Sequence, residues 1–519
     1  MLAILDTAVV SGLRGELVRV EVDVAPGLPS CQIVGLPDAA LSEARERVRS
    51  AVRNAGFEYP LSRITVNLAP ADRRKHGAAY DVAIAIGILL AHEQIRASGG
   101  PWALLGELSL DGAVMPVPGV LPMVATLRAS GHRRVCVPTV NVPEARLVSG
   151  VEAVGAEGLD DVARLVAGPR GRKAAAARRR APIRVARATA PAAADEAPGV
   201  EVTDLSDLRG QEQARWALEV ALAGRHNLLL VGSPGAGKTM LARAVPGLQP
   251  PLTDIEAHEV AVIRSVAGLP ATAADRLTRP FRSPHHTASY AAMVGGGPRL
   301  RPGLVTQAHL GTLFLDELAE FDRDVLDALR QPLEDGHIEV ERAHGSVRYP
   351  ARLQLIAAMN PCRCGWHGDP ERGCRCPPRE PERYVRRVSG PLLDRIDLRV
   401  VMPRMPAEQL VATNRPEDSA AVASRVRTAW SHALARNRGR PNAALRGHGL
   451  LRACALDNGA RAAVSDISGT LELTARGVHR MLRVARTIAD LRGRDRVGAD
   501  ELLSAASLRD RSLEAAEAA

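Results

Sequence analysis

Residues 232–239, Gly-Ser-Pro-Gly-Ala-Gly-Lys-Thr, have the composition and spacing of a loop that binds phosphate groups. The glycines leave backbone N–H groups free to surround phosphate oxygens, and the helix expected next points its positive dipole end at the same place. The lysine supplies a positive charge for the β and γ phosphates of a nucleotide, and the threonine supplies a hydroxyl ligand for Mg²⁺. The residues predicted to bind nucleotide are Gly232, Ser233, Pro234, Gly235, Ala236, Gly237, Lys238 and Thr239.

Two other apolar segments end in polar side chains that suit the same chemistry. Residues 311–315 are followed by Asp316, which can hold Mg²⁺ through water, and by Glu317, which can orient and polarise an attacking water. Residues 353–359 are followed by Asn360, whose amide can position that water, although the alternative is a turn-forming asparagine before proline. These residues predict hydrolysis of a nucleoside triphosphate.

Four of the seven cysteines form two Cys-x-Cys pairs, Cys362 with Cys364 and Cys374 with Cys376. Four thiolates so close together could surround a Zn²⁺ ion, although the spacing within each pair is tighter than the usual two-residue gap. The alternative is four reduced thiols in a loop. Seven cysteines in a chain of 519 residues do not fit a secreted disulfide scaffold.

The segments around these residues predict an α/β protein of several domains. Short apolar runs at 227–231, 311–315 and 353–359 are typical of buried parallel strands, and a helix is expected over 240–245. The expected domains are an α/β domain over residues 1–168, a linker over 169–200, an ATPase core over 201–403 and a helical domain over 404–519.

Composition restricts the compartment and the partners. The formal net charge is +10, and residues 170–187 contain eight Lys or Arg and no acid. A basic run of this kind favours polyanions, with a solvated linker as the alternative. The first residues lack a basic signal-peptide region, and the longest apolar run, residues 82–91, is too short to span a bilayer. We therefore expect a cytoplasmic protein.

From Leu208-Arg209-Gly210-Gln211 to Ser389-Gly390-Pro391-Leu392-Leu393-Asp394-Arg395, the chain resembles the magnesium-chelatase-like AAA+ ATPases. The whole chain, beginning with Ala8-Val9-Val10-Ser11-Gly12, resembles their YifB/ComM subfamily. The resemblance implies an AAA+ core with a parallel sheet and a helical lid, preceded by a Lon-protease-like domain. It implies ATP and Mg²⁺ as cofactors and a homo-oligomer, expected to be a hexamer, that acts on single-stranded or branched DNA in recombination and natural transformation.

The same resemblance implies further residue roles. Arg395 matches the arginine finger that reaches the γ-phosphate of a neighbouring subunit, and Arg476 matches the sensor-2 arginine of the lid. A hairpin over residues 335–349 and a glycine-rich insert over residues 283–301 would meet DNA. The contacts expected there, from Arg299, Arg301 and Arg342, would touch phosphates rather than bases, so binding would depend strongly on salt.

The Lon-like domain lacks the residues that proteolysis would need. Lon-type catalysis uses a serine activated by a lysine. The matching stretches, residues 75–81 and 119–123, contain no serine and no lysine respectively. We therefore expect no protease activity. The alternatives to a DNA motor are a chelatase-type motor subunit and an ATPase that remodels protein partners, neither of which would have a DNA activity.

Overall fold

The computed structural model describes residues 1–35, 39–70, 79–98, 100–176, 202–269, 276–296, 301–342, 345–369, 371–406, 408 and 416–509. The chain divides into two compact units. Unit 1 comprises Met1–Glu196, Ala257–Arg276 and Gly296–Pro302, and unit 2 comprises Ala197–Glu256, Leu277–Gly295 and Gly303–Ala519. No helix among the described residues is long and apolar enough to cross a membrane.

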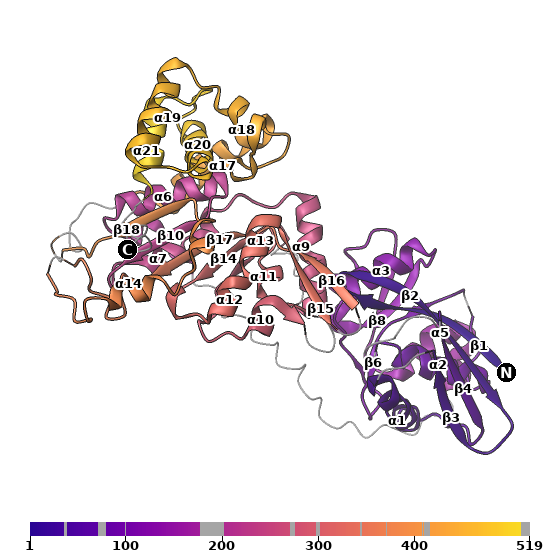
Figure 1. The fold of residues 1–519 in the computed structure, drawn as a ribbon. Helices are drawn as coiled ribbons and strands as arrows, with labels where there is room; N and C mark the ends of the chain where they lie inside the picture. Colours follow the sequence, from indigo (N-terminus) through magenta and orange to yellow (C-terminus); the bar gives the residue numbers. More distant parts are fainter. Residues whose placement is uncertain are drawn as a thin grey trace. The chain divides into compact units, whose positions relative to one another are not determined.

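Unit 1 is built on a mixed four-stranded sheet in the order β1-β2-β4-β3. The pairs β1–β2 and β2–β4 are antiparallel, whereas β3 and β4 run parallel. Helix α2 packs on β1 and β2 and is buried on nearly every side, as its unbroken apolar sequence predicts (Figure 1). The elements are β1 (Leu2–Ser11), β2 (Arg14–Ala25), β3 (Ser30–Val34), β4 (Arg63–Ala69), α1 (Ala39–Asn54) and α2 (Asp81–Ala91).

A second layer of unit 1 contains a parallel three-stranded sheet in the order β5-β8-β9 and a short hairpin of β6 and β7. Helix α5 has a break at Gly168 (φ 63°) and continues through residues that the sequence assigned to a linker. The elements are β5 (Ala103–Leu104), β6 (Glu107–Leu108), β7 (Val114–Met115), α3 (Val120–Ala129), β8 (Arg134–Pro138), α4 (Val142–Ala145), β9 (Glu152–Ala156) and α5 (Leu159–Ala176).

Most of helix α9 (Asp254–Ala267) belongs to unit 1, although it follows the phosphate loop in sequence. The carbonyl oxygen of Ser265 accepts a hydrogen bond from the N–H of Gly119 (2.8 Å), and its hydroxyl oxygen accepts one from the N–H of Leu121 (3.2 Å). These bonds satisfy the first N–H groups of α3, which have no partner within their own helix. A polar residue of α9 thus acts as a cap for a helix of the N-terminal domain.

Unit 2 contains a five-stranded parallel sheet in the order β11-β14-β17-β10-β18 (Figure 1). Every residue of β10, β14 and β17 is buried, which agrees with their continuous apolar sequences. Because β17 lies between β14 and β10, the polar residues that follow these strands meet at one edge of the sheet, which we call the carboxyl edge. The strands are β10 (Leu228–Gly232), β11 (Phe281–Arg282), β14 (Thr312–Leu315), β17 (Gln354–Met359) and β18 (Leu398–Met402).

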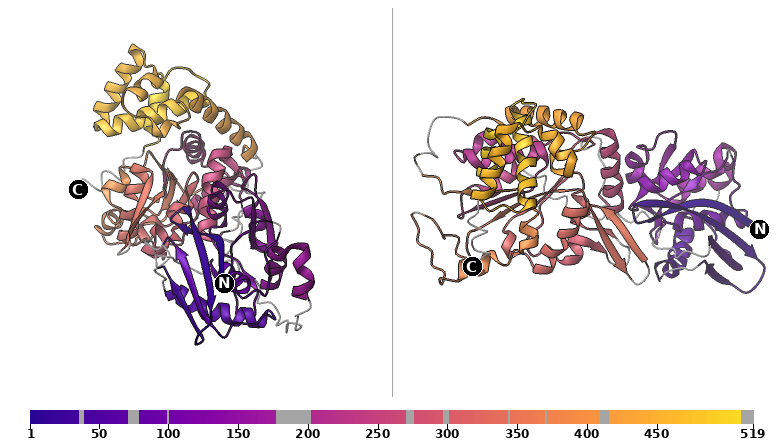
Figure 2. Two further views of the ribbon diagram at one scale, coloured as in Figure 1. Left: turned by 90° about the vertical axis from the view of Figure 1, so that its right-hand side faces the viewer. Right: turned by 45° about the horizontal axis from the view of Figure 1, so that its top comes forward.

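Helices of the last hundred residues gather in one cluster, the lid, which packs on α6 through α17 and α20 (Figures 1 and 2). The predicted α/β fold class, with its parallel core sheet, is confirmed. The lid helices and α6 are α6 (Glu212–Gly224), α17 (Ser419–Arg436), α18 (Gly447–Cys454), α19 (Asn458–Thr470), α20 (Ala475–Leu491) and α21 (Ala499–Ser507). The remaining helices around the sheet are α7 (Lys238–Arg243), α8 (Val245–Leu248), α10 (Tyr290–Val294), α11 (Leu304–Gln307), α12 (Arg323–Ala328), α13 (Arg330–Asp335), α14 (Glu380–Val385) and α15 (Gly390–Leu393).

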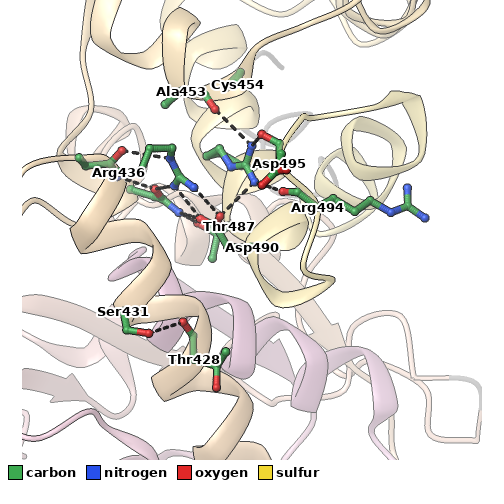
Figure 3. Close-up of polar contacts among 12 residues, drawn as sticks. Thr428, Ser431, Arg436, Ala453, Cys454, Thr487, Asp490, Arg494 and Asp495 are labelled. Carbon is green, nitrogen blue, oxygen red and sulfur yellow. Dashed lines mark hydrogen bonds and ion pairs between the residues drawn. The ribbon is translucent and has the colours of Figure 1, made fainter.

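The lid contains a group of polar side chains, all buried except that of Arg436, which we call the lid cluster (Figure 3). Asp490 is its centre: Arg436 donates to both of its carboxylate oxygens (2.6 and 2.8 Å), and Arg486 donates to one of them (3.0 Å). The side chains of Arg486 and Asp490 are 0% and 3% exposed. The lid cluster consists of Arg436, Asn442, Arg486, Thr487 and Asp490.

Candidate functional site

The phosphate loop connects the end of β10 to the start of α7. Its first glycine, Gly232, lies against β18, where a Cβ atom would approach the carbonyl oxygen of Met402 to 2.4 Å. Gly237 has φ of +92°, in the left-handed region that favours glycine, and it is the residue that caps α7. The two glycines therefore let the chain turn tightly enough for Lys238 to begin the helix.

Lys238 is held at the centre of the site. Its Nζ donates to the carbonyl oxygens of Gly232 (2.7 Å) and Ser233 (3.0 Å) and to Oδ1 of Asn360 (3.1 Å). Burial lowers the pKa of Lys238 from its usual value, and the nearby carboxylates of Asp316 and Glu317 oppose that shift. An ammonium group has three N–H donors and all are used here, so a phosphate oxygen would take the place of one acceptor.

Thr239 and Asp316 lie side by side. The Thr239 hydroxyl donates to Oδ2 of Asp316 at 2.6 Å, and Oδ1 of the same carboxylate accepts from the N–H of Glu317 at 2.9 Å. A hydroxyl and a carboxylate in contact form a set of hard oxygen donors that fits Mg²⁺. The strand order therefore brings Lys238, Thr239, Asp316 and Asn360 together at the carboxyl edge.

Glu317 occupies an unusual backbone position and has a partner that the sequence did not reveal. Its φ is +52°, and its side chain is 51% exposed. Oε2 of Glu317 lies 3.1 Å from Nδ1 of His286, and the ring of His285 lies 4.1 Å from that of His286. The sequence placed both histidines in an insert expected to meet DNA. The sequence did not reveal this contact because it depends on the pairing of β11 with β14. That pairing places the residues that follow the two strands at the carboxyl edge.

Arg395 and Arg476 make no side-chain hydrogen bond to the phosphate loop among the described residues. Arg395 follows α15 and forms an ion pair with Glu334 of α13, and its carbonyl oxygen accepts from Nδ2 of Asn227 at 2.7 Å. Arg476 is exposed near the start of α20. One turn later, Arg480 is buried and forms an ion pair with Asp394 at 3.1 Å. The lid helix is thus connected to the segment that carries Arg395.

The predicted DNA contacts are only partly described. Arg301 is exposed in β13 (Arg301–Pro302), whereas Arg299 and the side chain of Arg342 lie outside the described residues. β15 (His337–Arg342) and β16 (Gly345–Pro350) form an antiparallel hairpin. Its inner face buries Ile338, Val340 and Tyr349, while the exposed positions between them include Glu339, Glu341 and Arg348.

The four clustered cysteines lie close enough together to hold a metal ion. Their sulfur atoms all lie within 4.8 Å of one another, and the group contains no other residue type among the described residues. Cys362 is buried, and the other three are partly exposed. The arrangement agrees with the ligand set expected for Zn²⁺.

In the Lon-like region, residues 75–78 lie outside the described residues. Asp81, which ends the matching stretch, is fully buried and pairs with Arg47 at 2.9 Å. Burial raises the pKa of Asp81 to about 6, although the bond to Arg47 lowers it in part. This buried ion pair joins α1 to α2. Gly119, in the second stretch, lies against Val10, where a Cβ atom would meet Cγ2 at 2.2 Å.

Comparison with known families covers most of the chain. Residues 204–410 match the family described as magnesium chelatase, subunit ChlI; residues 20–141 match subunit ChlI of Mg-chelatase; and residues 416–509 match the ChlI C-terminal family. The ranges of these three matches include the phosphate loop, the cysteine cluster, the lid and most of the N-terminal domain.

Several curated proteins are similar over nearly the full length. An uncharacterised protein of Mycobacterium tuberculosis is 45% identical over 96% of this chain and 97% of its own length. The uncharacterised protein YifB of Escherichia coli is 42% identical, and the competence protein ComM of Haemophilus influenzae is 41% identical, each over 98% of this chain and 97% of its own length. Lon protease 2 of Bacillus subtilis is 30% identical over only 28% of each chain, a partial similarity that agrees with the Lon-like domain.

Proposed function

The chain belongs to the YifB/ComM family of magnesium-chelatase-like proteins, and from this premise we propose that it is an ATP-driven ring motor acting on single-stranded or branched DNA. Family membership implies an ATPase. The observation that carries the DNA assignment is the similarity to ComM, a competence protein, over 98% of the chain. Competence is the ability of a cell to take up DNA. Because the similarity to ComM covers nearly the whole chain, DNA is the first candidate for the substrate of this protein.

The residues at the carboxyl edge would divide the hydrolysis of ATP among them. Backbone N–H groups of the phosphate loop and Lys238 would bind the β and γ phosphates, and Thr239 and Asp316 would hold Mg²⁺, which would neutralise phosphate charge. Glu317 accepts a proton from the attacking water, and Asn360 orients that water while it remains in contact with Lys238. The partial exposure of Glu317 leaves room for water beside it.

The ring assignment depends on Arg395. Its side chain pairs with Glu334 of its own chain rather than with its own phosphate loop, which suits a residue that completes the site of a neighbouring subunit. An arginine supplied in trans stabilises the charge on the transferring phosphoryl group. Hydrolysis would then require assembly, with a hexamer as the expected ring. The ion pair of Arg480 with Asp394 connects lid helix α20 to the segment that contains Arg395.

A protein-remodelling or chelatase-type ATPase without DNA activity is the alternative, and one observation favours it. The exposed positions of the β15–β16 hairpin carry Glu339 and Glu341 beside Arg348, so the described part of this surface is not basic. Attraction of DNA to the hairpin would have to come from its tip. The two proposals therefore differ in whether DNA changes the ATPase rate.

The test measures ATP hydrolysis by the purified protein alone and with single-stranded, forked and four-way-junction DNA, together with strand displacement. The DNA-motor proposal expects stimulation that disappears as salt rises, because phosphate contacts release counterions. An ATPase rate that DNA leaves unchanged, with no displaced strand, would reject the proposal in favour of the alternative.

A pair of variants tests whether Arg301 contacts DNA. Arg301→Ala should weaken DNA binding similarly for all sequences and reduce the salt slope by about 1. Arg323→Ala is the control, because Arg323 is 80% exposed on α12, outside both predicted inserts. Equal DNA affinity for the two variants would remove Arg301 from the DNA-binding surface.

A further inference from the structure

The cysteine insert, residues 361–376, connects the end of β17 to the segment before α14 (Figure 1). It begins directly after Asn360, so it starts at the carboxyl edge. Its four cysteines are free thiols. The hydrolysis scheme uses none of them, and neither ATP binding nor DNA contact explains why four thiols meet at one point.

The spacing of the sulfur atoms fits a tetrahedral metal site. The Sγ atom of Cys362 lies 3.4 Å from that of Cys364 and 3.7 Å from that of Cys374, and the latter two are 3.6 Å apart. Four ligands at the usual Zn–S distance of about 2.3 Å in a tetrahedron would be separated by about 3.8 Å. Cys376 lies within 4.8 Å of the other three and completes the set.

The insert rests on the phosphate loop through two contacts. Oδ2 of Asp369 accepts a hydrogen bond from the hydroxyl of Ser233 at 3.0 Å. Gly365, with φ of +84°, lies so close to the loop that a Cβ atom there would approach Cδ of Pro234 to 2.5 Å. Ser233 and Pro234 are the second and third residues of the loop, so the insert supports the part that must keep its shape to surround phosphate.

The carboxylate of Asp369 is itself held in place by the insert. Its other oxygen, Oδ1, accepts from the N–H groups of Glu371 (3.0 Å) and Arg372 (2.9 Å). Asp369, Glu371 and Arg372 lie between the two cysteine pairs in the sequence, so their positions depend on how the pairs are joined. A metal ion that ties Cys362 and Cys364 to Cys374 and Cys376 would fix the loop that presents Asp369 to Ser233.

We propose that the cysteine insert binds one Zn²⁺ ion through Cys362, Cys364, Cys374 and Cys376, and that this metal holds the phosphate loop in the shape that binds ATP. Binding releases the thiol protons to solvent, since the thiolate is the ligand. This inference deepens the assignment of residues 232–239 as the ATP site and rests on that assignment, but it does not depend on DNA.

The first experiment measures metal content and ATP affinity in the same preparation. Protein purified under reducing conditions should contain one zinc per chain by elemental analysis. Removal of the metal with a chelator should weaken binding of a fluorescent ATP analogue by about tenfold, the upper range for loss of one hydrogen bond such as that from Ser233 to Asp369, and added Zn²⁺ should restore it. Cys374→Ser should lose the metal, whereas Cys31→Ser, in β3 of unit 1, should keep both metal and affinity.

A second variant separates the metal site from its effect on the loop. Asp369→Ala should retain zinc but bind the ATP analogue about fivefold more weakly, because one hydrogen bond to Ser233 is lost. Glu371→Ala is the matched control, since that carboxylate pairs with Arg404 instead. This variant keeps the test valid if Cys374→Ser fails to fold.

The outcomes are distinct. Absence of zinc from the reduced protein, with no uptake of added Zn²⁺, would overturn the metal site. Stoichiometric zinc whose removal leaves ATP affinity unchanged would overturn the role in shaping the loop. Failure of the DNA-motor proposal would leave both measurements unaffected, because neither uses DNA.

Discussion

Two of the groups of charged side chains in unit 2, the lid cluster and the carboxyl edge, are built differently. In the lid cluster, Asp490 is 3% exposed and its oxygens accept from Arg436, Arg486 and Asn442 (Figure 3). At the carboxyl edge, Glu317 is 51% exposed and its one described partner is His286. Both places combine acids with bases, yet only the first is closed to solvent.

The difference indicates which charges are structural. A buried carboxylate with every oxygen paired has nothing left to offer a ligand, and its loss leaves arginines without compensation. A partly exposed carboxylate with one partner can exchange that partner for water or substrate. Lys238 lies between these two cases. It is buried like Asp490, but one of its three acceptors belongs to Asn360, which is only half-buried. Four variants test this division, in order of decreasing effect.

Arg395→Ala should have the largest effect. If Arg395 acts on a neighbouring subunit, the turnover number of the assembled protein should fall by about 10³–10⁵-fold, while affinity for ATP stays the same. Steady-state ATPase assays and analogue binding measure the two quantities. An unchanged turnover number would place Arg395 with the structural arginines, bonded to Glu334 and to the carbonyl oxygen of Pro391 in its own chain.

Mixing experiments test whether Arg395 acts in trans. Arg395→Ala subunits keep an intact phosphate loop, and Lys238→Ala subunits keep the arginine. Mixed rings should therefore recover part of the activity that each variant lacks alone, because an intact loop then faces an intact arginine. No recovery in rings shown to be mixed would contradict action across the subunit boundary.

Glu317→Gln should reduce turnover by about 10²–10⁴-fold, the usual contribution of a general base. The amide keeps the size of the side chain and can still meet His286, so the fold and ATP binding should be preserved. Single-turnover hydrolysis measures the loss directly. Hydrolysis at the wild-type rate would show that another group activates the water.

Asp490→Ala should act on stability instead of chemistry. Removing the carboxylate leaves the buried Arg486 without its anion, which costs about 3–5 kcal/mol in the free energy of unfolding. Urea unfolding measures it, and Asp466→Ala, at an exposed position of α19, is the control. A loss of ATP turnover without a loss of stability would contradict the structural assignment of the lid cluster.

Sequence alone predicted the features that depend on local geometry. The spacing from Gly232 to Thr239 is demanded by the backbone that surrounds phosphate, and Asp316 and Asn360 follow apolar runs that are typical of buried parallel strands. The parallel core sheet was therefore predictable. The relative order of its strands was not, since no local pattern states which strand pairs with which.

The features that were missed all depend on such long-range pairing. The contact of His286 with Glu317 requires β11 beside β14, and the bond of Asp369 to Ser233 requires the cysteine insert to fold back on the phosphate loop. Among the arginines of α20, the sequence singled out Arg476, which is exposed, while Arg480 and Arg486 are buried in ion pairs. Helical spacing alone does not distinguish an arginine that forms an ion pair with a distant acid from one that stays exposed.

His286→Ala should have the smallest effect and tests the comparison most directly. Oε2 of Glu317, the carboxylate proposed to activate water, lies 3.1 Å from Nδ1 of His286, so the histidine would compete with water for that oxygen. Exposed ion pairs are worth up to about 1 kcal/mol, so freeing the carboxylate should raise the DNA-independent ATPase rate by up to about fivefold. His285→Ala is the matched control, because its ring contacts His286 but it has no described bond to Glu317. If His286→Ala instead fell to the rate of Glu317→Gln while His285→Ala kept the wild-type rate, His286 would be a required support for Glu317, in contradiction to the prediction.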